Sequence, residues 1–462
     1  MRKIIFILIV TYLSSSVQAQ DWKDVAVPAE AAQGYKWELQ PAPSDDFNYT
    51  FTAVKSKSNF GEDKWYNFYH NGWNGPGTTY WQYDHVSVDG SDLVIKSSRN
   101  PSTSKMGVPG VNAGCITSNN KVKYPVFVES SVSVANITLA SDVWLLSPDD
   151  TQEIDIIECY GGADNGNAFF AKFIHLSHHS FIRNPFQDYQ PRDLNSWWER
   201  SGVSSWGEYA WNNGERKYIR IGVNWISPIH FEYYIDGERV RVMYDKAFAT
   251  KKGNTWFYTY PSMTNGQLDF ENGYQKITQH ATGNTYSFQT LETASNASST
   301  SVIDPYNYQN GNGYTKELDI IINVESQDWH VEADRTPTDA ELNDPNKNTM
   351  KVDWIRVYKP VVDPNYVDKE VNEENNEFVL SADDPASSIR IYPNPANDTL
   401  HVQSSLLIRN ITILQIDGKK IGMEQINSKN KTLNISLLNA GTYLLNINYS
   451  NGQLETKRIV VR

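Results

Sequence analysis

Short segments rich in β-branched and aromatic residues recur along most of this chain, and clusters of Gly, Asn, Asp and Pro separate them. Examples are GSDLVIKSS, PVFVESSVSVANIT, RKYIRIGVNW and KVDWIRVYKP. The segment YYIDGERV is a β-hairpin sequence with Asp236 and Gly237 at its turn. Many closely spaced strands with few helical patterns predict an all-β sandwich or barrel.

Composition divides the chain into four segments. Residues 1–19 combine two basic residues, an apolar run and a small-residue end, which predicts an export signal peptide. Residues 20–360 hold the strand-rich region, and residues 361–385 read as an acidic, amide-rich linker. From 386 to 462 a second β pattern, which includes IRIYPNPANDTLHV, predicts a small separate β-sandwich domain.

Charge and residue content exclude some classes of function. The formal net charge of -13 disfavours nucleic acid and highly sulfated polysaccharide as partners. The 14 Trp, 27 Tyr and 17 Phe, with many hydroxyl and amide side chains, suit a protein that handles carbohydrate. Cys115 and Cys159 lie in apolar strand-like runs, so we expect buried free thiols, with a disulfide as the alternative.

The segment EIDIIE, residues 153–158, places three carboxylates in an isoleucine-rich run. In a regular strand Glu153 and Asp155 share one face and Glu158 lies on the other. A β-bulge around Ile156 and Ile157 returns Glu158 to the face of the other two acids. The segment therefore predicts a bulged strand with three acids in line.

Three acids on one face suit retaining glycoside hydrolysis, in which two carboxyl groups about 5 to 5.5 Å apart act as nucleophile and acid/base. We predict Glu153 as the nucleophile, Glu158 as the acid/base and Asp155 as a helper that orients Glu153. The alternative is an edge strand with solvated acids. The segment ELDIII, residues 317–322, has a similar start but lacks the third acid, and it is predicted to be only a neighbouring core strand.

Longer motifs point to a family. The segments FYHNGWNGPG, LASDVWLLSPDDTQEIDIIECYG, HLSHHSFIRNPFQDYQP and LDIIINVESQDW resemble those of marine bacterial β-agarases of glycoside hydrolase family 16, over about residues 21 to 360. The resemblance implies a β-jelly-roll sandwich with a concave substrate groove. It also implies endo-acting, retaining hydrolysis of β-1,4 links in agarose, without a cofactor for the chemistry. Residues 161–170 and 250–313 match nothing in the family.

Two rival functions stay open. One is a porphyranase or carrageenase that acts on a sulfated galactan, for which Arg183 and Lys172 are the basic candidates near the groove. The other is a non-catalytic agar-binding lectin, which the pair Glu153 and Glu158 disfavours because a lectin has no use for two crowded carboxylates.

The resemblance also implies a substrate-binding set. Trp144 is expected to be a sugar platform, with a core Trp as the alternative, and Trp73 is expected at the groove edge. The polar candidates are His70, Asn71, His178, His179, Arg183, Asp188 and Glu325. The paired histidines lack a matching ligand set, so hydrogen bonding is favoured over metal binding. A structural calcium ion, bound through hard oxygen ligands, would match Gly90 and Asp353.

The C-terminal segment resembles the sorting domain of the type IX secretion system, with a carbohydrate-binding β-sandwich as the alternative. It implies export across both membranes, followed by release or attachment to the cell surface. We therefore expect a red-algal galactan and the secretion machinery as partners, and a monomer with no membrane span.

Overall fold

The computed structural model describes residues 21–32, 34–103, 105–212, 215–364, 366, 389–415, 419–449 and 454–462. The chain divides into two compact units, Met1–Lys369 and Glu370–Arg462. The predicted signal peptide 1–19 and most of the predicted linker 361–385 lie outside the described residues.

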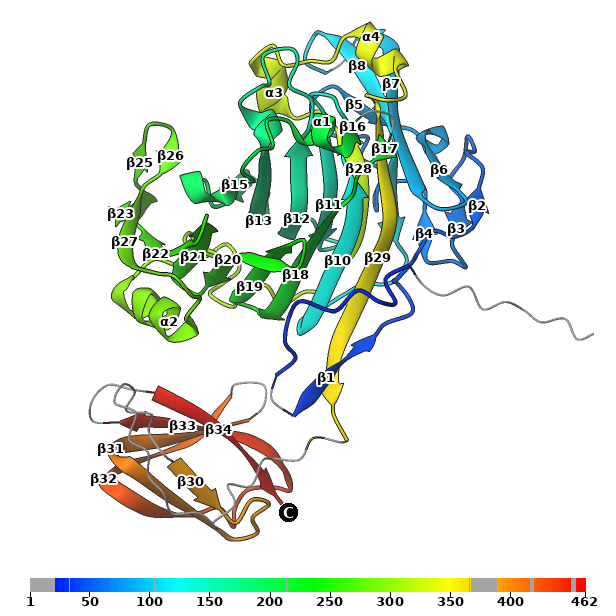
Figure 1. Ribbon diagram of the computed structural model, residues 1–462. Helices are drawn as coiled ribbons and strands as arrows, with labels where there is room; N and C mark the ends of the chain where they lie inside the picture. Colours follow the sequence, from blue (N-terminus) through cyan, green and yellow to red (C-terminus); the bar gives the residue numbers. More distant parts are fainter. Residues whose placement is uncertain are drawn as a thin grey trace, which may run out of the picture. The chain divides into compact units, whose positions relative to one another are not determined.

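The first unit is the predicted β-sandwich, and its larger sheet has 14 strands (Figure 1). The main path of this sheet runs β2-β6-β7-β29-β10-β18-β19-β20-β21-β22-β27, and β1, β5 and β8 pair beside it. Its strands are β1 (Tyr35–Leu39), β2 (Thr50–Phe51), β5 (Thr79–Trp81), β6 (Val86–Asp89), β7 (Leu93–Thr103), β8 (Pro109–Ala113), β10 (Val126–Ser133), β18 (Ile219–Ser227), β19 (His230–Ile235), β20 (Glu238–Tyr244), β21 (Ala247–Lys252), β22 (Thr255–Pro261), β27 (Ile277–Gly283) and β29 (Thr349–Val362).

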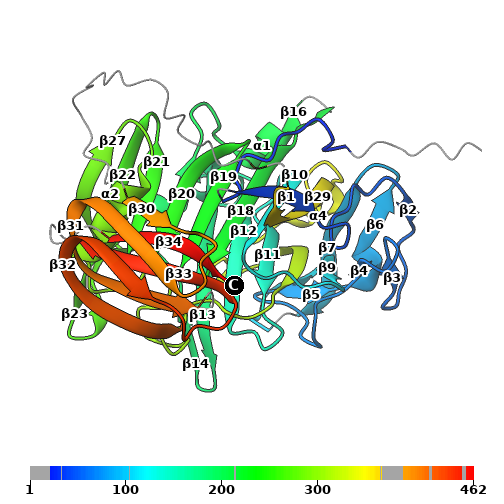
Figure 2. The ribbon, with the colours of Figure 1, turned by 90° about the horizontal axis from the view of Figure 1, so that it is seen from below.

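The smaller sheet has nine strands in the order β14-β13-β12-β11-β28-β9-β4-β3, with β15 paired to β13. Its strands are β3 (Asn59–Phe60), β4 (Trp65–Tyr66), β9 (Cys115–Ser118), β11 (Ala140–Leu146), β12 (Gln152–Tyr160), β13 (Phe173–Arg183), β14 (Phe186–Tyr189), β15 (Trp197–Glu199) and β28 (Asp319–Glu325). Figure 2 shows β18, β19 and β20 of the larger sheet running beside β11, β12 and β13.

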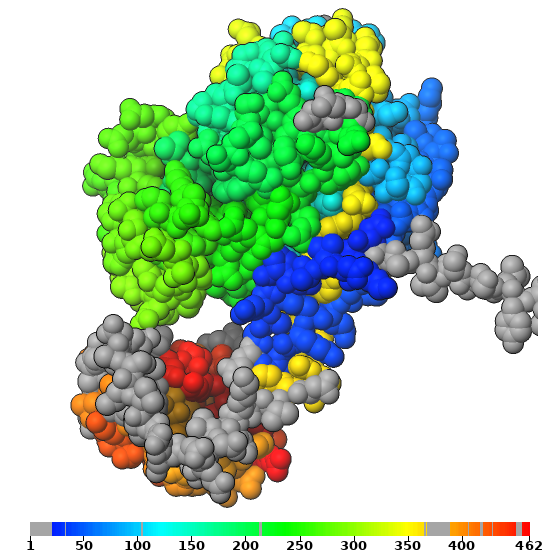
Figure 3. Space-filling model, in the orientation of Figure 1, coloured from blue at the N-terminus to red at the C-terminus, as the bar shows by residue number. Residues whose placement is uncertain are grey.

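Short elements complete the first unit. Three strand pairs are β16 (Trp211–Asn212) with β17 (Glu215–Arg216), β23 (Met263–Thr264) with β24 (Gln267–Leu268), and β25 (Phe270–Glu271) with β26 (Tyr274–Gln275). The helices are α1 (Trp206–Ala210), α2 (Phe288–Ala297), α3 (Asp328–Glu332) and α4 (Asp339–Asn343), with 3-10 turns η1 (Tyr83–His85), η2 (Phe170–Lys172) and η3 (Leu194–Ser196). The light-green segment that holds β21 to β27, which the family motifs do not match, forms a ridge at one edge of the unit (Figure 3).

The core lies between the two sheets because every second residue of each strand faces inward. Ile154 of β12, Val223 of β18 and Phe231 of β19 are fully buried members of one apolar cluster. Both cysteines are buried and free, which confirms the sequence prediction. The Tyr233 hydroxyl donates to the Ser177 carbonyl at 2.6 Å, so a polar contact also joins the sheets.

The second unit is a five-stranded antiparallel sheet with its own core, centred on Leu400, Leu445 and Ile459. Its strands are β30 (Ile389–Tyr392), β31 (Thr399–Gln415), β32 (Lys420–Asn434), β33 (Gly441–Tyr449) and β34 (Leu454–Val461). No helix in the described part of either unit is long and apolar enough to cross a membrane.

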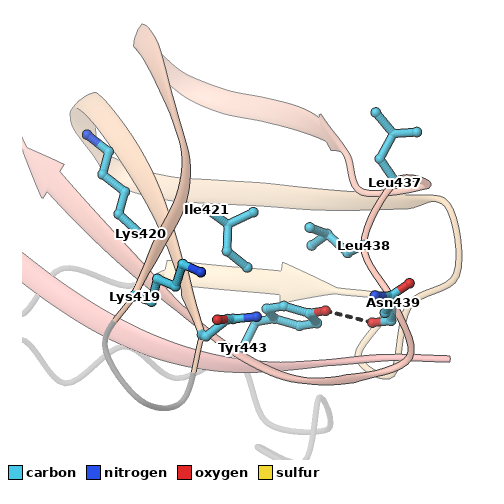
Figure 4. Close-up of a pocket in the computed structure, with 8 residues that line it drawn as sticks. Lys419, Lys420, Ile421, Leu437, Leu438, Asn439 and Tyr443 are labelled. Atoms are coloured by element: carbon cyan, nitrogen blue, oxygen red, sulfur yellow. Dashed lines mark hydrogen bonds between the residues drawn. The ribbon is translucent and has the colours of Figure 1, made fainter.

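A shallow pocket of about 260 Å³ opens on the second unit (Figure 4). Its lining combines lysines, aliphatic residues and Tyr443, whose hydroxyl donates to the Asn439 carbonyl at 2.8 Å. The residues that line it include no carboxylate. The acids of residues 153–158, which the sequence predicts to be catalytic, lie in the first unit.

Candidate active site

Strand β12 contains the predicted bulge. On one side Val143 of β11 pairs with Ile157 and Trp144 pairs with Asp155, so Ile156 is an extra residue. On the other side Ser177 of β13 pairs with Asp155 and His175 pairs with Glu158. The extra residue brings Glu158 to the same face as Glu153 and Asp155, which confirms the predicted geometry. We call this outer face of the smaller sheet the carboxylate face.

An imidazolium neutralises part of this charge. The Nε2 atom of His179 lies 3.5 Å from Asp155 Oδ2 and 3.8 Å from Glu153 Oε1, and its Nδ1 atom lies 2.8 Å from Asp188 Oδ1. Burial lowers the pKa of His179, but Asp188 and Glu153 outweigh it and raise the pKa to about 10. His179 is therefore charged at neutral pH and acts as the central ion-pair partner of three acids.

Glu153, Asp155 and His179 are also the one group in the described part of the chain whose ligand atoms lie close enough to share a metal ion. A metal ligand must be a neutral imidazole, whereas His179 holds its proton between Asp188 and the two carboxyls. The ion-pair role therefore fits this group better than a metal role does.

Glu158 has different partners. Its carboxylate accepts hydrogen bonds from the Tyr160 hydroxyl and from His175 Nδ1, the latter at 2.6 Å. Burial raises the pKa of Glu158, but these hydrogen bonds and the charge of His175 lower it to about 2. Burial and Asp155 raise the pKa of Glu153, and burial raises that of Asp155 to about 6. In the free protein Glu158 is therefore ionised at neutral pH, whereas the pKa of Glu153 is raised.

Sequence reasoning missed His175 and Tyr160. The strand period of two would have found them, because His175 lies four residues before His179 and Tyr160 lies two residues after Glu158. The ring of His175 also stacks on Trp197, at a centroid distance of 4.3 Å, which fixes its plane.

A second group of acids lies toward β28. Glu325 is 8% exposed, and Asn323 Nδ2 donates to its Oε2 atom at 3.0 Å. Burial and the charges of Glu158 and Asp155 raise the pKa of Glu325 to about 8, so it is protonated at neutral pH. Asp142 of β11, which the sequence did not single out, is buried on the same face opposite Glu158. The segment ELDIII was predicted to be a neighbouring core strand, and this is confirmed because Ile320, Ile321 and Ile322 are fully buried in β28 beside β11. The residues that follow it, Asn323 and Glu325, lie on the carboxylate face.

The two predicted sugar-stacking tryptophans differ in exposure. Trp73 is 46% exposed, whereas Trp144 is only 8% exposed and packs beside Tyr69 at a centroid distance of 6.1 Å. Trp144 nevertheless lies directly opposite Asp155, so its side chain is on the carboxylate face.

His70 and Asn71 hold the loop that carries Trp73. His70 Nε2 lies 2.6 Å from Asp150 Oδ1, and Asn71 Nδ2 donates to Asp150 Oδ2 at 3.1 Å. The Asn71 side-chain oxygen accepts from the Trp73 backbone N–H at 2.8 Å. These polar atoms are occupied within the protein, so His70 and Asn71 shape the loop that presents Trp73.

Arg183 and His178 have opposite surroundings. The exposed guanidinium of Arg183 donates to the Asp150 carbonyl and lies over the Phe181 ring at 4.3 Å. His178 is fully buried between the sheets, where it stacks on Phe231 at 5.7 Å. The prediction that His178 contacts substrate is wrong, because neighbouring residues of a strand face opposite sides and His179 faces outward.

The predicted calcium residues lie on the larger sheet and its turns. Gly90 has a φ of 109° in the turn between β6 and β7. Burial and the charges of Asp21 and Asp92 raise the pKa of Asp353 to about 6. Carboxylate oxygens are the ligands a hard cation prefers, but in the described part of the chain the acids around Asp353 do not form a group close enough to share a metal ion.

The fold and the carboxylate face together define a carbohydrate-cleaving hydrolase of the jelly-roll class. Residues 37–260 match the family model "Beta-porphyranase A-D, GH16 domain", and residues 390–462 match "Secretion system C-terminal sorting domain". The chain belongs to glycoside hydrolase family 16, within the group that contains the β-agarases, and it ends in a type IX sorting domain.

Named relatives cover the same regions. The chain is 43% identical over 495 residues to Beta-agarase D of Zobellia galactanivorans, with 100% of each chain covered. It is 40% identical to a Beta-agarase of Phocaeicola plebeius, over 74% of this chain and 90% of that protein. The crystal structure of the catalytic domain of β-agarase D from Zobellia galactanivorans superposes with a TM-score of 0.68 and 49% identity, over 74% of this chain and 100% of that one.

A further solved relative carries a ligand. An inactivated mutant of β-agarase B in complex with agaro-octaose is 39% identical, with a TM-score of 0.54, over 74% of this chain and 100% of that one. The same region of this chain thus matches a protein whose crystal structure holds agaro-octaose.

Proposed function

We propose that this protein is an exported, endo-acting β-agarase that hydrolyses β-1,4 links of agarose with retention. The bulge of β12, which collects Glu153, Asp155 and Glu158 on one face, is the observation that carries the proposal. The names of the relatives support agarose as substrate. The sorting domain supports type IX export.

In the proposed mechanism Glu153 attacks the anomeric carbon and Glu158 protonates the departing glycosidic oxygen. Glu158 then takes a proton from the water that releases the sugar from Glu153. Asp155 and His179 orient Glu153 and balance its charge. Because the pKa of Glu158 is about 2 in the free protein, Glu158 must take up a proton when substrate binds, before the bond breaks.

Substrate contacts are assigned to the exposed Trp73 and Arg183, and to Trp144 and Glu325, which lie on the carboxylate face with 8% of their surface exposed. Trp73 and Trp144 contact sugar rings, and Arg183 and Glu325 bond hydroxyl groups. His179 and Asp188 are assigned no direct contact with the sugar. They position the catalytic acids, because His179 pairs with Asp188 and lies beside Glu153 and Asp155.

A porphyranase is the second candidate, since the matching family model carries that description. It needs a cation for a sulfate group. Arg183 is one candidate, whereas the ammonium of Lys172 lies over the rings of Phe169 and Phe173, at 5.2 and 4.8 Å. Release of reducing ends from agarose, porphyran and κ-carrageenan, measured side by side, separates the two candidates.

The change Glu153→Ala tests the mechanism. We expect kcat on agarose to fall by about 10⁴-fold or more, because covalent catalysis is lost, while oligosaccharide binding persists. Added azide should restore turnover and give an α-glycosyl azide, which NMR identifies. A β-glycosyl azide would mean that Glu153 is the acid/base and that the two roles are reversed.

We also propose a structural calcium ion at Asp353 and the Gly90 carbonyl. The carboxylates near Asp353 would hold it, and the ion would relieve their mutual repulsion. We expect EGTA to lower the Tm of the wild type and to leave that of Asp353→Asn nearly unchanged, as measured by calorimetry.

A further inference from the structure

One buried amide joins the Trp144 ring to two carboxyls. Asn323 has no exposed surface. Its Oδ1 atom accepts from the Trp144 indole N–H at 2.6 Å, and its Nδ2 atom donates to Asp142 Oδ2 at 3.2 Å and to Glu325 Oε2 at 3.0 Å. Both donor positions and the oxygen of the amide are used, so its orientation is determined.

This amide belongs to a row of side chains next to the proposed acid/base. Asp142 of β11 lies opposite Glu158 of β12 on one side and opposite Asn323 of β28 on the other. Directly opposite residues of antiparallel strands have Cβ atoms about 4.5 to 5.5 Å apart. The row therefore connects Glu158 to Asn323 across three strands.

The two carboxyls that Asn323 bonds both have raised pKa values. Burial, followed by the charge of Glu325, raises the pKa of Asp142 well above its usual value, and the pKa of Glu325 is about 8. Asp142 Oδ1 is buried and has no hydrogen-bond partner among the described residues. Each carboxyl thus depends on Asn323 for one of its hydrogen bonds.

The plane of the Trp144 ring has two supports. Tyr69 stacks beside it at an interplanar angle of 25°, and Asn323 accepts its N–H. A tilt of the ring would leave a buried donor without an acceptor, which is unfavourable. The plane of the Trp144 ring is therefore set in part by an amide with no exposed surface.

We propose that Asn323 is a positioning residue for substrate binding, which holds the Trp144 ring and the Glu325 carboxyl in one arrangement and is anchored by Asp142. The inference rests on the proposed function, because Trp144 and Glu325 contact sugar in that proposal. It adds Asn323 and Asp142 to the residues on which galactan binding depends.

Two substitutions at one position test the proposal. Asn323→Leu removes all three hydrogen bonds at similar volume. Asn323→Asp keeps the acceptor for Trp144 but donates only when its new carboxyl is protonated. On soluble agaro-oligosaccharides we expect KM to rise about tenfold for both variants near pH 8, with kcat changed less than about threefold. As pH falls, KM of Asn323→Asp should approach the wild-type value, whereas KM of Asn323→Leu should not.

Asn224→Asp is the matched control. Asn224 is also a buried strand amide, and it donates to Glu232 Oε2 at 3.2 Å in the larger sheet. This control should lower Tm without changing KM. If the Asn323 variants also lower Tm and keep KM within about twofold of the wild type, Asn323 is only structural and the proposal is overturned.

Trp144→Phe tests the same bond even if Asn323→Leu fails to fold, because it keeps an aromatic ring and lacks the N–H. We expect KM to rise, and the double variant with Asn323→Leu to be less affected than the product of the two single effects. An unchanged KM in Trp144→Phe, or multiplicative effects, overturns the inference. A wild type that does not cleave agarose refutes the proposed function instead.

Discussion

Glu158 on β12 and Glu325 on β28 lie on the same face of the same sheet, yet at neutral pH Glu158 is ionised and Glu325 is protonated. The pKa of Glu158 is about 2 and that of Glu325 is about 8. Burial raises the pKa of both. The difference therefore comes from neighbouring charges and hydrogen-bond partners: Glu158 and Asp155 raise the pKa of Glu325, whereas His175 lowers that of Glu158.

Glu158 and Glu325 accept hydrogen bonds from different kinds of side chain. Glu158 is bonded by His175 of β13 and by the Tyr160 hydroxyl, and both donors favour the anion. Glu325 is bonded by the amides of Asn323 and Gln327, which carry no charge to offset those of Glu158 and Asp155. Among buried acids, the chemistry of the partner decides which one is ionised.

Glu158→Gln has the largest expected effect in this comparison. We expect kcat on agarose to fall by about 10² to 10⁴-fold, because general acid–base catalysis is removed. The loss should be smaller for an aryl glycoside whose leaving group needs no proton. If Glu325→Gln produces an equal loss, the distinction between the two strands is wrong.

Glu325→Gln should lower kcat/KM only a few-fold at pH 6, since glutamine resembles the protonated acid that is present there. In the wild type Glu325 becomes an anion as pH rises through about 8, beside Glu158 and Asp155. We therefore expect KM of the wild type to rise above pH 8 and KM of the variant to stay level. If KM rises above pH 8 in both the wild type and the variant, a group other than Glu325 causes the rise.

His179→Gln has the smallest expected effect in this series, a pH-dependent change in Tm. The pKa of His179 is raised from 6.5 to about 10 in the folded protein. Its stabilising contribution is therefore complete below about pH 6.5 and is lost as pH rises to about 10. Calorimetry should show the largest difference in Tm between wild type and variant at low pH. A difference that does not depend on pH would contradict the ion-pair role.

The bulge of β12 could be read from the sequence, because the spacing of three acids in EIDIIE requires an extra residue to place them on one face. The exposed Trp73 and the outward-facing His179 also followed from motifs. His178 was misplaced because the alternation rule was applied to EIDIIE and not to the paired histidines. The partners of Glu158 and Glu325 were missed because hydrogen bonds between strands do not appear in a linear pattern.

By itself, the sequence determined the strand-rich fold, the division into a large and a small β unit, and the family, because these depend on local periodicity and on long ordered motifs. It also determined that Glu153, Asp155 and Glu158 share a face. The tertiary structure alone decided which of these acids is ionised and which side chains support Trp144. Those properties depend on His175, Asp142 and Asn323, which are distant along the chain and become neighbours only when β13, β11 and β28 pair into one sheet.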